Sequence, residues 1–135
     1  MIIMRCIWRV VSLRGMSCMA VLEMRVALTV EDFEAVTAFY RDGLGLDPAA
    51  LWTEHGKALL FHAGRATLEV FDSVQADMVD QLEVGERVSG QIRFAFEVAD
   101  VHAALARALE YGATLVHEPV LTPWNDLNAR VRSPE

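Results

Sequence analysis

Two arginines occupy equivalent positions in a short segment that occurs twice in the sequence. Residues 24–32 read MRVALTVED and residues 92–100 read IRFAFEVAD, so that Arg25 falls on Arg93, 68 residues further along. A guanidinium group carries five hydrogen-bond donors, stays positively charged and has no lone pair to offer a metal ion. It binds carboxylate and phosphate groups through paired hydrogen bonds. The repeated arginine therefore indicates binding of an anion or an internal ion pair, and argues against metal coordination.

The pattern around Arg25 predicts a strand, a helix and three further strands. Residues 24–30 alternate strictly between apolar and other side chains, which is typical of a half-buried strand. Asp32 follows as a helix N-cap, and apolar residues at helical spacing continue through residues 33–45 to two glycines. Three more strands are expected over residues 49–53, 57–63 and 66–72. The first half of the chain is thus predicted to be β-α-β-β-β.

The same order begins again at Arg93. A strand is expected over residues 92–98, and Asp100 should cap a helix that runs over residues 101–109. A strand over 113–119, a loop over 120–128 and a strand over 128–132 complete the pattern. A fourth strand would fall beyond Glu135, so we expect the last strand of the second copy to be missing. Either the sequence is truncated or a partner chain supplies that strand.

Acidic residues gather between the two copies. Residues 73–90 are polar and are predicted to be a linker with one short helix around 75–82. A solvent-exposed surface is expected for its acidic residues, which are Asp77, Asp80, Glu83 and Glu86. The net charge of −7 argues against a nucleic-acid partner, because such proteins need a basic face.

The first 23 residues differ in composition from the rest. They are apolar but interrupted by arginines, and their uncharged runs are too short to span a bilayer, so no membrane partner is expected. We expect residues 1–23 to be a disordered or dispensable extension, with an ordered extra strand or helix and a targeting segment as alternatives. Both cysteines, Cys6 and Cys18, lie there, which leaves no disulfide framework elsewhere and fits the cytoplasm.

Several of these segments resemble the sequences of a known protein family. The segments FYRDGLGLD, ATLEVF, RFAFEVADV, YGATLV, EPVLTPW and NARVRSPE resemble the vicinal oxygen chelate superfamily of glyoxalases, bleomycin-resistance proteins and extradiol dioxygenases. The resemblance covers residues 24–135 and implies one α+β domain. In this fold two tandem βαβββ modules form a cup-shaped mixed sheet. Module one would span residues 24–72 and module two residues 91–135, on either side of the linker at 73–90.

The resemblance also implies where a metal would bind. Metal-using members take their ligands from the first and last strands of each module, which correspond here to Arg25, Glu69 and Arg93. The fourth position would lie near residue 137, outside the sequence. Arginine cannot ligate a cation, and one carboxylate does not make a tight site. We therefore predict no metal at this place and no cofactor, and we assign no catalytic residue.

Other residues are expected to line the same cup. Arg25, Glu69 and Arg93 alternate out of phase with the apolar residues of their strands, so they form either a structural Arg–carboxylate–Arg bridge or a receiver for an anionic ligand. Candidates for further ligand contacts are Trp52, His62, Trp124 and Asn128. Loop packing is the alternative for both tryptophans. For His62 a role as general acid or base is a further alternative.

Three functions are compatible with these features. The first is a metal-free binding module for a small molecule, of the glyoxalase and bleomycin-resistance type. The second is a metal-dependent lyase or dioxygenase of the glyoxalase type, which would make the protein an enzyme. The third is a structural or regulatory dimer with a filled cup. A homodimer is expected in each case, because members of the superfamily commonly pair their modules across a dimer.

Overall fold

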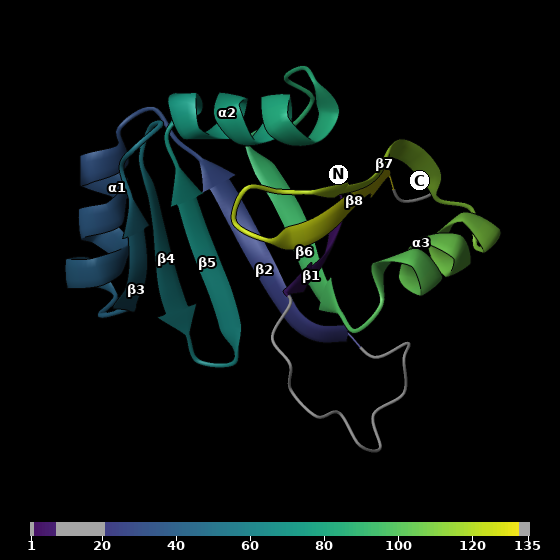
Figure 1. Cartoon of the computed structure of the whole chain (residues 1–135). Helices are drawn as coiled ribbons and strands as arrows, with labels where there is room; N and C mark the ends of the chain where they lie inside the picture. Colours follow the sequence, from purple (N-terminus) through teal and green to yellow (C-terminus); the bar gives the residue numbers. More distant parts are fainter. Residues whose placement is uncertain (1, 8–20, 133–135) are drawn as a thin grey trace. The chain divides into compact units, whose positions relative to one another are not determined.

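The computed structural model describes residues 2–7 and 21–132, which fold into two compact units (Figure 1). The first unit is Arg25–Phe94, and the second combines Met1–Met24 with Ala95–Glu135. The two units share one plan, in which a helix packs on one face of a four-stranded sheet. Among the described residues, no helix is long and apolar enough to cross a membrane.

The first unit has the expected β-α-β-β-β order. Its elements are β2 (Val21–Thr29), α1 (Phe33–Ala38), the π-helical turn η1 (Phe39–Gly43), β3 (Asp47–Trp52), β4 (Ala58–Ala63), β5 (Ala66–Phe71) and α2 (Ser73–Val84). The strands lie in the order β3-β4-β5-β2. Neighbours are antiparallel except for β2 and β5, which are parallel, so the sheet is mixed. The α+β class and the mixed sheet are therefore confirmed.

Helix α1 covers one face of this sheet. It begins at Asp32, whose side chain accepts a hydrogen bond from the Ala35 backbone N at 3.0 Å, as its capping position predicts. Phe33 of the helix packs on alternate residues of β4 and β5, namely Leu59, Phe61 and Val70. The side chains between them in sequence point to the opposite face, and that face carries the candidate site.

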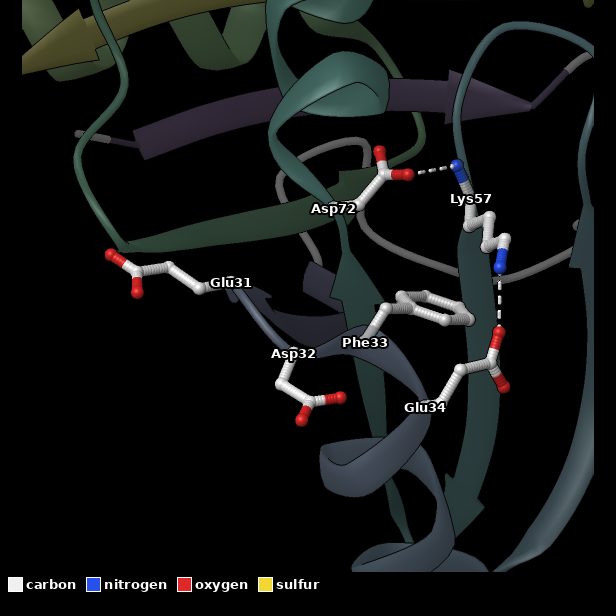
Figure 2. Close-up of a pocket in the computed structure, with 6 residues that line it drawn as sticks. All are labelled: Glu31, Asp32, Phe33, Glu34, Lys57 and Asp72. Atoms are coloured by element: carbon white, nitrogen blue, oxygen red, sulfur yellow. Dashed lines mark hydrogen bonds and ion pairs between the residues drawn. The ribbon is translucent and has the colours of Figure 1, made fainter.

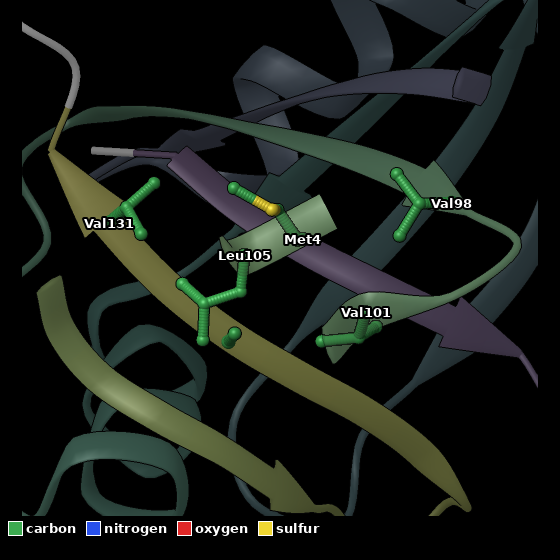
Figure 3. Packing of buried hydrophobic residues seen from close by; sticks show 6 residues of the cluster. Met4, Val98, Val101, Leu105 and Val131 are labelled. Carbon is green, nitrogen blue, oxygen red and sulfur yellow. The ribbon is translucent and has the colours of Figure 1, made fainter. Parts of the chain in front are cut away.

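The second unit repeats this plan with one change. Its elements are β6 (Ile92–Val98), whose first three residues belong to the first unit, α3 (Val101–Glu110), β7 (Thr114–Leu121), β8 (Asp126–Arg132) and the N-terminal strand β1 (Ile2–Ile7). The strand order is β6-β1-β8-β7. Asp100 caps α3 by accepting a hydrogen bond from the Ala103 backbone N at 3.0 Å. Figure 3 shows the core of this unit, in which Met4, Val98, Leu105 and Val131 meet between the strands and α3.

The N-terminal segment differs from the expected extension. Residues 2–7 form an ordered strand that pairs antiparallel with β8, with Met4 opposite Ala129. The strand is held because Met4 is 7% exposed and packs in an apolar cluster with residues of β6, α3 and β8. Residues 8–20 lie outside the described residues. Within those residues, module two supplies β6, β7 and β8 from its own sequence, and β1 is its fourth strand.

Two further boundaries are corrected. The predicted loop over 120–128 is only four residues long, because β7 continues to Leu121 and β8 already begins at Asp126. Thr122 closes this short turn, since its hydroxyl accepts a hydrogen bond from the Asp126 backbone N at 3.1 Å. The predicted linker holds a twelve-residue helix, α2, capped by Asp72.

Candidate functional site

The open face of the first-unit sheet carries several of the predicted residues in register. Arg25 of β2 is the neighbour of Thr67 on β5, and Thr67 is the neighbour of His62 on β4. Glu69 lies two residues beyond Thr67 and therefore points to the same face. Polar side chains from three adjacent strands thus share one face of the sheet, opposite α1.

Arg25 and Glu69 form an ion pair on this face. The Arg25 Nη1 donates a hydrogen bond to the Glu69 Oε1 at 3.3 Å, and the two side chains are 12% and 14% exposed. This contact is one half of the predicted Arg–carboxylate–Arg bridge. A carboxylate that is already neutralised by a guanidinium is a poor ligand for a cation.

Arg93 has a partner that the sequence pattern did not indicate. Its Nη1 donates a hydrogen bond to the Asp80 Oδ1 of α2 at 3.3 Å, and both side chains are almost fully buried. Its guanidinium also lies over the ring of Phe71, 4.3 Å from the centroid. Burial between a carboxylate and an aromatic ring gives Arg93 a structural role within the first unit.

Asp80 is the centre of a buried polar network. Its carboxylate accepts hydrogen bonds from the backbone N of Val88 at 3.0 Å and of Ser89 at 2.8 Å, and from the Ser89 hydroxyl at 2.8 Å. The expectation of a solvent-exposed position is therefore wrong for Asp80, and also for Glu83, which is 2% exposed. The signal was present, because Ala76, Val79, Asp80 and Glu83 follow helical spacing along one face of α2.

Two more candidates lie on the same first-unit face. His62 lies on β4 beside Thr67 of β5, and it is exposed. Trp52 ends β3 opposite Ala58, and its side chain is 44% exposed. Both rings are accessible to a ligand, whereas Arg25 and Glu69 are largely occupied with each other.

The remaining candidates belong to the second unit. Asn128 is buried on β8. Trp124 lies in the turn before β8 and is 43% exposed, so both the packing and the ligand interpretation stay open for it. Arg5 of β1 was not predicted, yet it is the register neighbour of Asn128 and forms an ion pair with Asp126 at 3.6 Å.

A separate acidic hollow in the first unit has a structural explanation. Figure 2 shows it lined by Glu31, Asp32, Phe33, Glu34, Lys57 and Asp72. The Lys57 backbone N donates a hydrogen bond to Asp72 at 2.9 Å, and its Nζ donates one to Glu34 at 2.6 Å. That side-chain hydrogen bond and the charge of Glu34 raise the pKa of Lys57 above its ordinary value. Asp32 and Asp72 cap helices, so these carboxylates already have structural tasks.

Metal-ligating side chains do not cluster in the part of the chain that the structure describes. No group of three or more His, Cys, Asp or Glu residues there is arranged to hold a metal ion. Arg25 and Arg93 have only donors to offer, and their carboxylate partners are engaged. These residues do not fit a divalent cation, and no chemical step through a metal can be derived from them.

Comparison with known proteins gives one family and one fold. Residues 24–135 match the family model described as Glyoxalase/Bleomycin resistance protein/Dioxygenase superfamily. A hypothetical protein of Bacillus halodurans C-125 aligns with a TM-score of 0.59 and 16% identity, over 80% of this chain and 81% of that one. No curated protein sequence matches.

A second solved structure covers a longer protein. A triple mutant of 4-hydroxymandelate synthase from Streptomyces coelicolor aligns with a TM-score of 0.55 and 21% identity. The alignment covers 86% of this chain but only 36% of the synthase chain. At these identities both structures show a shared fold and nothing about activity.

Proposed function

Because the chain belongs to the Glyoxalase/Bleomycin resistance protein/Dioxygenase superfamily, we propose that it binds a small molecule without a metal ion. The observation that carries this proposal is the ion pair between Arg25 and Glu69, which takes up the carboxylate that a cation would need. Two of the positions that the family resemblance assigns to metal ligands are arginines, whose guanidinium groups cannot coordinate a cation.

Two exposed rings on the same sheet face as this pair are the candidate contacts for a ligand. His62 offers one ring nitrogen as a donor or acceptor, and Trp52 offers a flat apolar surface and an N–H donor. Both belong to the face of the first-unit sheet opposite α1, on which α2 covers only the end that carries Ala58 and Phe71. A ligand on this face would stack on an aromatic ring and be oriented by a few polar groups, which is the usual composition of a small-molecule site.

A ligand screen with a divalent-metal arm tests this function. We expect zinc and manganese ions to leave the melting temperature Tm unchanged within about 1 °C. A fragment that binds should raise Tm by about 10 °C at a hundred times its dissociation constant, because it stabilises only the folded state. The alternative lyase or dioxygenase requires a metal, so stoichiometric metal uptake that Glu69→Ala abolishes would overturn the proposal.

Matched variants distinguish binding at a specific site from nonspecific binding in the same assay. Replacing His62 with alanine should weaken binding of the fragment several-fold, whereas His55→Ala, in the exposed turn before β4, should not. Equal losses in the two variants, or no fragment that binds at all, would favour the purely structural dimer instead.

We also propose that the protein forms a homodimer. Ile92 and Phe94 stand two residues apart on one face of β6 and are 57% and 43% exposed. Exposed neighbouring apolar side chains of this size favour an interface. We expect light scattering after size exclusion to give twice the mass of 15.0 kDa for the native chain and the monomer mass for Phe94→Glu. A native monomer at micromolar concentration would contradict the proposal.

A further inference from the structure

Helix α2 buries one of its faces against the first-unit sheet. Ala76 and Val79 of the helix pack with Ala58 and Phe71 of the sheet, and Asp80 is buried on the same side of the helix. A helix that covers a sheet with one face turns its opposite face away from that sheet. The opposite face of α2 is therefore the part of the helix that another molecule could contact.

This outer face carries an apolar ridge. Val74, Met78 and Leu82 are spaced four residues apart, so their side chains follow one another along the helix. Val74 and Leu82 are 57% and 44% exposed, and Met78 between them is half-buried because it also packs against the cluster beneath α2. Rows of side chains with this spacing pack into the grooves of a neighbouring helix. The α2 ridge, formed by these three residues, is thus suited to contact a second helix.

The α2 ridge is locally neutral although the protein is acidic. The net charge of −7 opposes association of two copies wherever exposed carboxylates would face each other. Of the acidic residues of α2, Asp80 and Glu83 are buried, and Asp77 is exposed but forms an ion pair with Arg87. Gln81, which is exposed on the same face of the helix, carries no charge. The charge on this face therefore fits a second copy of the chain better than a basic partner, which would need unpaired carboxylates.

The α2 ridge and the exposed apolar pair of β6 belong to opposite faces of the first-unit sheet. Arg93 of β6 points to the face that α2 covers, where it contacts Asp80. Ile92 and Phe94 precede and follow Arg93 on the strand, so they point to the other face. A single twofold interface cannot use both surfaces, and the α2 ridge therefore offers a second contact between copies.

We propose that two copies of the chain pair through their α2 ridges, with the two helices antiparallel and Met78 near the twofold axis. This arrangement places Val74 of one copy against Leu82 of its partner. It also places the positive end of each helix dipole beside the negative end of the other. Three side chains bury less than the roughly 800 Å² per partner of a stable interface, so the contact is weak and depends on concentration. It links the dimers proposed through β6 into larger assemblies, and it does not require those dimers to exist.

Sedimentation velocity over a concentration series tests the contact in the Phe94→Glu variant, in which the β6 contact is disrupted. We expect the mass to rise from 15.0 kDa at about 10 μM toward twice that value at about 1 mM, as a weak interface of this size allows. Adding Val74→Lys alone, or Leu82→Glu alone, should keep the protein monomeric over the same range. Adding both should restore the rise in mass, because antiparallel pairing brings the two new opposite charges together.

Leu44→Glu is the matched control, added to the same Phe94→Glu background. Leu44 lies in the first unit outside α2 and is 58% exposed, so its replacement should leave the rise in mass unchanged. Circular dichroism would establish that each variant is folded. A Phe94→Glu protein that stays monomeric at every concentration, or a rise in mass that survives Leu82→Glu, would overturn the inference. A folded protein with both α2 substitutions that stays monomeric would overturn the antiparallel arrangement. Masses of Phe94→Glu and the native chain that rise together would support the α2 contact and count against the dimer through β6.

Discussion

Replacing Asp80 with alanine should lower the free energy of unfolding by about 3–5 kcal/mol, because it removes the buried carboxylate that faces the buried Arg93 guanidinium. The substitution also removes the acceptor for the backbone N–H groups of Val88 and Ser89. Each buried donor left without a partner adds a desolvation cost of its own. Urea denaturation followed by circular dichroism would measure the loss.

Asp77→Ala is the control for this prediction. Asp77 lies on the same helix, its side chain is 63% exposed, and it pairs with Arg87. A pair at the surface contributes about 1 kcal/mol or less, so the control should stay close to the native protein. Equal losses from the two substitutions would show that burial of Asp80 does not govern the stability of the first unit.

Removing both charges separates the ion pair from the rest of the network. The double variant Asp80→Leu with Arg93→Met should be more stable than either single variant, because neither member of this pair is left behind as a buried charge facing an apolar side chain. The Phe71 ring would then contact a methionine side chain in place of the guanidinium. A double variant less stable than both single variants would mean that Asp80 acts mainly through its backbone hydrogen bonds.

The features that the sequence predicted correctly depend on local information. Alternation over residues 24–30 and helical spacing after Asp32 and Asp100 involve neighbours within a few residues, and all three elements are present. Because the segment repeats after 68 residues, the first strand and helix of the second copy could be predicted from those of the first. Family membership followed from the same segments and is confirmed by the match over residues 24–135.

The features that the sequence did not reveal depend on partners far along the chain. From the sequence, Asp80 resembled an exposed acidic residue. The cost of burying its carboxylate is offset by hydrogen bonds from Ser89 and Arg93, which follow later in the chain. Residues 2–7 resembled an extension because their partner, β8, begins about 120 residues later. An apolar run interrupted only by Arg5 was the local signal over residues 2–7, and it does not show the alternation that marks a half-buried strand.

The Met4 side chain gives the sharpest test of the N-terminal strand. It is 7% exposed and packs with Val98, Leu105 and Val131 in the core of the second unit. Met4→Ala should therefore lower the free energy of unfolding by about 2–5 kcal/mol, the usual cost of emptying a buried site of this size. Thermal and urea denaturation of the full chain would measure it.

Met24→Ala provides the comparison, because the same residue type on β2 is 41% exposed. Its truncation removes little buried surface and should cost less than about 1 kcal/mol. If the two methionine substitutions had equal small effects, β1 would not be part of the second-unit core.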